Sequence, residues 1–118
     1  MTGRADVAAL RRECINVTQI EPWGEAAAVA VLLGFEPVAA DKRFAAHVDR
    51  DGINWDAVLA DETWSTGERF LIATAAGLWS GRPHGADVCR SAFLDDDFYE
   101  VWLAMVTASR TGKVPGDG

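Results

Sequence analysis

The chain has 118 residues, of which 49% are hydrophobic and 25% are charged, a composition typical of one globular domain that folds without metals or disulfides. Acidic residues outnumber basic residues 18 to 11, and the resulting net charge of −7 disfavours direct binding to nucleic acid or to an anionic membrane surface. No apolar stretch of a secretory signal precedes Cys14, so this thiol and that of Cys89 are expected to be free in the cytoplasm.

Two helices are predicted in the first third of the chain. Residues 4–13 predict a helix with an apolar stripe formed by Val7, Leu10, Cys14 and Val17. The β-branched residues within 14–21 are compatible with either a helix or a short strand. Pro22 is expected at the first position of a second helix, which is apolar nearly all round, ends at Gly34 and packs against the central helix.

Short elements are predicted in the middle of the chain. Asp41 is expected to cap a helix that runs as far as Val48. The acidic turn at residues 49–52 resembles a calcium loop, but the EF-hand register fails because Val58 would occupy the position of the bidentate glutamate. We therefore interpret this segment as a solvated turn. Asn54 is expected to cap the short helix that follows it.

The strongest helix signal lies at residues 65–80. Ser65 and Glu68 have the spacing of a capping box, in which each side chain accepts a hydrogen bond from the other residue's backbone N–H. The residues that follow are almost all apolar, so this helix is expected to be buried on most sides. Gly81 and the proline two residues later are expected to end it.

The C-terminal third predicts a short helix over residues 87–93 and a longer final helix. Asp95 is expected to cap the final helix, and Gly112 to end it. A buried stripe is predicted along it: Phe98, Val101, Trp102, Met105 and Val106. The sequence therefore predicts an all-α fold, a compact bundle of about five to seven short helices around a buried central helix. We assign residues 1–112 to this single domain and residues 113–118 to a flexible tail.

The sequence contains no pattern typical of a catalytic, cofactor or metal site. His84 precedes Cys89 by five residues, which allows a Cys–His pair, but no orienting acid accompanies them. The run of Asp95, Asp96 and Asp97 is explained by a helix N-terminus, which favours negative charge. The same run excludes DNA recognition by the helix–turn–helix-like outline of the C-terminal third, because a recognition helix presents its N-terminus to phosphates. We expect neither cofactor nor bound metal, and no enzymatic activity.

Two motifs in the C-terminal half, from Ile53 onward, resemble those of small uncharacterised proteins of actinobacteria and their phages. The first joins STGER at residues 65–69 to LWSG at residues 78–81, and the second joins LDD at residues 94–96 to ASR at residues 108–110. These motifs consist of helix caps and core positions. The resemblance implies an intracellular setting and a phage or mobile-element origin, and it implies no site.

We therefore expect a non-enzymatic, acidic helical protein that acts by binding an unidentified protein partner. Five tryptophans are many for one small core, and tryptophan is enriched at interface hot spots. Those near predicted element ends are expected to be partly exposed, whereas Trp79 and Trp102 lie within apolar stripes and are expected in the core. The candidate partner-binding residues are Trp23, Trp55, Trp64, Arg82, His84, Asp95, Asp96 and Asp97.

Three alternatives stay open. The protein could be an acidic nucleic-acid mimic that inhibits a DNA-binding host protein, for which the carboxylates would have to form one surface stripe. It could instead be a small enzyme that uses His84 and Cys89, or the aspartate run at residues 95–97. Finally, the chain could form a homo-oligomer, whether it binds a protein partner or mimics nucleic acid.

Overall fold

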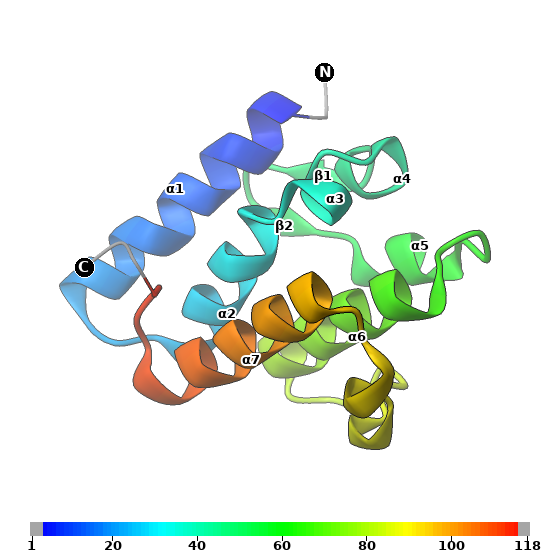
Figure 1. Ribbon diagram of the computed structural model, residues 1–118. Coiled ribbons are helices and arrows are strands. Elements are labelled where there is room, and N and C mark those ends of the chain that lie inside the picture. The colour runs from blue at the N-terminus through cyan, green and yellow to red at the C-terminus, as the bar shows by residue number, and fades with distance from the viewer. Residues whose placement is uncertain (1–3, 116–118) are drawn as a thin grey trace.

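The computed structural model describes residues 4–115 as a helical bundle with one short β-hairpin, which confirms the all-α class (Figure 1). The hairpin is antiparallel and pairs Val48 with Ile53 and Asp49 with Gly52. In chain order the elements are α1 (Arg4–Ile20), α2 (Gly24–Leu33), α3 (Glu36–Ala39), α4 (Lys42–Ala45), β1 (Val48–Asp49), β2 (Gly52–Ile53), α5 (Trp55–Ala60), α6 (Thr66–Ser80), the 3₁₀ helix η1 (Val88–Phe93) and α7 (Asp96–Thr111).

Helix α2 lies at the centre of the bundle and packs against α1, α6 and α7. It is buried nearly all round, and most of its buried side chains are small: Ala26, Ala27, Ala28, Val29, Ala30, Leu32 and Leu33. A β-carbon built on Gly24 would collide with the backbone of Ser109 in α7, so the two helices touch along their main chains. The helix predicted over residues 65–80 is α6, which also packs against α7 and has these buried residues: Phe70, Leu71, Ile72, Ala73, Ala75 and Ala76.

The predicted ends of α6 are confirmed. The hydroxyl of Ser65 accepts a hydrogen bond from the Glu68 N–H at 3.1 Å, and the Glu68 carboxylate accepts one from the Ser65 N–H at 2.8 Å. Gly81 ends the helix in the left-handed conformation, with φ at 70°. Both ends follow from local chemistry, which explains why the sequence alone located them.

Helix α1 extends through the segment that was left open between helix and strand. It continues to Ile20, and the Thr18 hydroxyl donates to the Ile15 carbonyl at 2.6 Å. Burial of this face against α2 outweighs the weak helix propensity of β-branched residues. The placement of Pro22 was wrong. Helix α2 starts at Gly24, and Trp23 precedes it in extended conformation with its N–H donating to the Gly112 carbonyl at 3.3 Å.

The middle segment contains the predicted caps and an unpredicted hairpin. The Asp41 carboxylate accepts from the Arg43 N–H, and the Asn54 side chain accepts from the Ala57 N–H, as capping residues do. The helix after Asp41 ends at Ala45, however, and Val48 belongs to β1. Strands of two residues are too short to show a period of two, so the sequence pattern could not indicate them.

The C-terminal helix corrects two expectations. Met105 is fully buried, but Val106 is 37% exposed, so the buried stripe was wrong at its last position. Val114 is 8% exposed and belongs to the core, so the predicted tail of residues 113–118 begins too early, while residues 116–118 lie outside the described part. Gly112 ends α7 as predicted, with φ at 72°. Within residues 4–115, no helix combines the length and hydropathy needed to cross a bilayer.

Candidate functional site

The tryptophans expected to be exposed do not share one environment. Trp23 is 43% exposed, in agreement with the expectation. Trp55 and Trp64 are only 8% and 6% exposed, so the expectation that they are partly exposed was wrong. The indole N–H of Trp64 donates to the Val58 carbonyl at 2.9 Å, and the Arg43 guanidinium lies 4.0 Å from the centre of its ring. These contacts between α4, α5 and α6 turn the side chain inward.

Trp79 was expected in the core but is 38% exposed. It lies on the last turn of α6 and stacks on Trp23 with ring centroids 5.8 Å apart and planes at 25°. Trp102 is half-buried and contacts the rings of Phe70 and Tyr99, with centroids 5.9 and 6.0 Å away. The exposed pair of indoles therefore consists of Trp23, which was expected to be exposed, and Trp79, which was expected in the core.

A cleft of about 650 Å³ adjoins the stacked indoles, and we call the cleft with the two rings the tryptophan surface. It lies between α1, the start of α2, the turn of the hairpin and the end of α6. Apolar atoms of Leu10, Cys14 and Ala26 line it together with the two rings. Charged residues of both signs also line it: Arg12, Glu13, Arg50 and Asp51. Aromatic side chains beside mixed charges are typical of a surface that binds protein.

The cysteine in this cleft is unsuited to nucleophilic chemistry. Burial, with a smaller contribution from the negative charge of Glu13, raises the pKa of the Cys14 thiol to about 11. A thiol with this pKa is almost entirely protonated near neutral pH, and the thiolate is the reactive form. Cys14 therefore contributes apolar surface to the cleft, as buried free cysteines usually do.

His84 is held by α6 and not by Cys89. Its Nε2 atom lies 3.0 Å from the Ser80 hydroxyl, which donates to the Ala76 carbonyl at 2.8 Å. Cys89 is exposed in η1, where its backbone N–H donates to the Asp87 carboxylate at 3.0 Å. The geometry of His84 is that of a loop anchor, and the described residues show no hydrogen bond between it and a thiol or carboxylate.

The remaining candidate residues are solvated. Arg82 is exposed, and its backbone N–H donates to the Ser80 hydroxyl at 3.2 Å. Asp95, Asp96 and Asp97 are all exposed, and Asp95 precedes α7 without the side-chain cap hydrogen bond that the sequence predicted. Among residues 4–115, no three His, Cys, Asp or Glu side chains gather closely enough to hold a metal ion.

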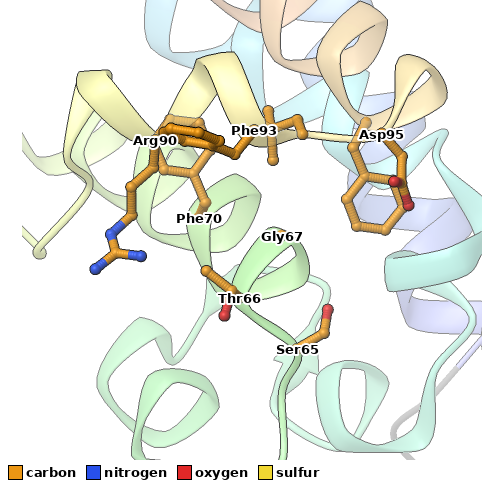
Figure 2. A pocket seen from close by; sticks show the side chains of 9 residues that line it. Ser65, Thr66, Gly67, Phe70, Arg90, Phe93 and Asp95 are labelled. Atoms are coloured by element: carbon orange, nitrogen blue, oxygen red, sulfur yellow. The ribbon is translucent and has the colours of Figure 1, made fainter.

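A second pocket, of about 390 Å³, lies between the first turn of α6 and the junction of η1 with α7. Figure 2 shows Arg90 and Asp95 at opposite ends of this pocket, with the turn that carries Ser65 and Thr66 below them. A helix N-terminus beside an arginine can attract an anion, but here the capping box already uses the hydroxyl of Ser65. The carboxylate of Glu68 occupies the end of the helix, so a further anion would meet negative charge.

Sequence reasoning missed a group of exposed apolar side chains in the C-terminal third. Val88 and Phe93 of η1 are 67% and 88% exposed. Tyr99 and Leu103 of α7 are 41% and 47% exposed. The signal was present in the sequence: Tyr99, Leu103 and Val106 are spaced four and three residues apart, which places them on one face of α7.

The comparisons with known proteins do not extend this description. No protein-family model matches the chain, no curated protein matches it, and no solved structure matches its fold.

Proposed function

We propose that the protein acts without catalysing a reaction, by binding another protein through the tryptophan surface. The observation that carries this proposal is the stacked pair of Trp23 and Trp79, whose rings are 43% and 38% exposed beside the cleft. Exposure of two indoles to water is unfavourable in the free protein, and a partner that covers them recovers apolar burial. The rings also hold each other in place, so little side-chain entropy is lost on binding.

The lining of the cleft favours a partner with an apolar anchor and polar flanks. The buried side chains of Leu10 and Ala26 form an apolar floor next to the exposed indoles, while Arg12 and Asp51 add charges of opposite sign to the lining. A partner selected by overall charge would instead meet one predominant sign. The mixed lining therefore supports protein binding over mimicry of nucleic acid, which would use the exposed aspartates at residues 95–97.

The test is capture of partners from host lysate after nuclease treatment, washed at low and at high salt. Wild type, Trp23→Ala and Trp79→Ala are compared with Phe93→Ala, which removes an aromatic ring that is 88% exposed outside the tryptophan surface. We expect one stoichiometric partner that survives high salt, binds the Phe93 variant normally and is lost from both tryptophan variants. Circular dichroism confirms that each variant is folded.

Two outcomes would contradict the proposal. A partner retained equally by both tryptophan variants would place its binding site elsewhere on the molecule. A partner released at high salt, with basic character, would favour the acidic nucleic-acid mimic. We include in the proposal a cytoplasmic accessory or regulatory role in a phage or mobile element, which rests on the sequence resemblance alone.

A further inference from the structure

The solvent-facing side of α7 presents a second apolar stripe, separate from the stripe that enters the core. Its three apolar members, Tyr99, Leu103 and Val106, are 41%, 47% and 37% exposed. The same spacing reaches the exposed Asp96, three residues before Tyr99, and the exposed Arg110, four residues after Val106. Residues that alternate by three and four form the contact seam of paired helices. We call these five residues the outer seam.

Helix α7 lies on the outside of the bundle. It packs against α2 and α6, and Figure 1 shows it in front of both. Met105 and Ala108 of the same helix are fully buried. The outer seam therefore lies on a face of α7 that residues 4–115 leave open to solvent.

The outer seam carries opposite charges at its two ends, which lie equally far from Leu103 in the sequence. Leu103 lies midway between Asp96 and Arg110, and Tyr99 and Val106 flank it. Within the described part of the chain neither Asp96 nor Arg110 forms an ion pair. If a second α7 runs antiparallel across a twofold axis at Leu103, Asp96 of each copy meets Arg110 of the other. Tyr99 of each copy then lies near Val106 of the other.

We propose that the chain forms an antiparallel homodimer in which the outer seams of two copies pack together, with Leu103 at the twofold axis. Such an interface uses the same patch on both copies, as isologous dimers do. The antiparallel direction places Glu100 opposite the uncharged Val106 of the second copy, whereas a parallel pair would set Asp96 against Asp96. Val88 is 67% exposed and lines the same groove as Val106, so η1 extends the apolar patch toward the area of a stable interface.

The first test is sedimentation equilibrium of the full chain from micromolar to millimolar concentration. We expect a reversible dimer. Asp96→Arg and Arg110→Asp should each raise its dissociation constant about tenfold, because each creates two like-charge contacts. The double variant should restore wild-type dimerisation, since it only reverses the direction of both ion pairs. A wild-type chain that stays monomeric throughout would overturn the proposal. So would single variants that dimerise as tightly as wild type, because a parallel pair sets like charges against each other in the variants just as it does in the wild type.

The second test is disulfide cross-linking at the axis, in a Cys89→Ala background that removes the exposed native thiol. Leu103→Cys should form a cross-linked dimer under mild oxidation, because the two copies of residue 103 face each other. Ala8→Cys, at an exposed position on α1, is the matched control and should stay monomeric. Equal cross-linking of the two variants would overturn the proposal, as would loss of the dimer in Trp23→Ala with no effect of the seam variants. This inference uses none of the residues of the tryptophan surface, so either proposal can fail without the other.

Discussion

Trp64 offers the sharpest test of how the structure departs from the sequence pattern. Its side chain is 6% exposed and contacts three neighbouring groups. The indole N–H donates to the Val58 carbonyl, the Arg43 guanidinium covers one face of the ring, and the ring belongs to the hydrophobic core. Replacement by alanine removes all three contacts at once, whereas phenylalanine removes the hydrogen bond and keeps a ring under the guanidinium.

The two variants are expected to differ by several kcal/mol. Truncation of a buried tryptophan to alanine costs about 3–5 kcal/mol of unfolding free energy, through lost burial and the cavity that remains. Trp64→Phe should cost about 0.5–1.5 kcal/mol, because the Val58 carbonyl loses the indole donor but keeps the hydrogen bond from the Asp61 N–H. A domain of this size has a total stability of about 5–15 kcal/mol, so the alanine variant should stay measurable but weakly folded.

The assay is urea unfolding followed by circular dichroism at 222 nm, since fluorescence would change with the tryptophan count. Trp23→Ala is the matched control and should cost less than about 1.5 kcal/mol, because its ring is already 43% exposed. If Trp64→Ala cost less than about 1 kcal/mol with an unchanged m-value, Trp64 would lie at the surface, and the packing of α4 and α5 against α6 would be refuted.

Three further predictions test separate parts of the structure. Gly24→Ala should lose about 1–3 kcal/mol in the same urea assay, because its β-carbon meets the backbone of α7, whereas Gly52→Ala, with open space around it, should be nearly neutral. Hydrogen bonds from Arg43 hold the pKa of Asp41 in the folded protein below its ordinary value of 3.8. The stabilisation from this pair is therefore complete above pH 3.8 and is lost as the pH falls through the lower pKa of the folded state. Asp41→Asn should make the free energy of unfolding less dependent on pH in this acidic range. Cys14, which is buried and has a raised pKa, should react with a thiol reagent only as fast as the chain unfolds, whereas the exposed Cys89 should react at once. Equally fast labelling of the two cysteines would contradict the burial of Cys14.

The features that the sequence predicted correctly are those whose physics is local. The capping box of Ser65 with Glu68, the Asn54 cap, and the glycine ends of α6 and α7 each depend on residues within one helical turn. The length of α1 was underestimated because its second half is helical only through packing against α2. The hairpin was missed because two-residue strands have no period to detect.

The candidate site was predicted only in part, because exposure depends on contacts between distant elements. Proximity to a helix end indicated that Trp23 is exposed, but the same reasoning failed for Trp55 and Trp64, which α4 and α5 turn inward. An apolar run indicated that Trp79 is buried, but this residue lies on the last turn of α6, where it stacks on Trp23 and is 38% exposed. No pattern in the sequence specifies which side chains of α6 the neighbouring helices leave exposed.

The small side chains of α2 help to explain why aromatic residues lie at the surface of this protein. Four alanines fill the centre of the bundle, and they let α1, α6 and α7 approach so closely that little volume remains for large rings. Phe44 is the one aromatic residue among the largest side chains that are fully buried, and all five tryptophans keep some exposure. Tryptophan side chains that do not fit in the centre of the bundle lie at its edges, as Trp23 and Trp79 do. A core built from alanine thus leaves the chain with aromatic surface available for binding, most of all at the stacked indoles of the tryptophan surface.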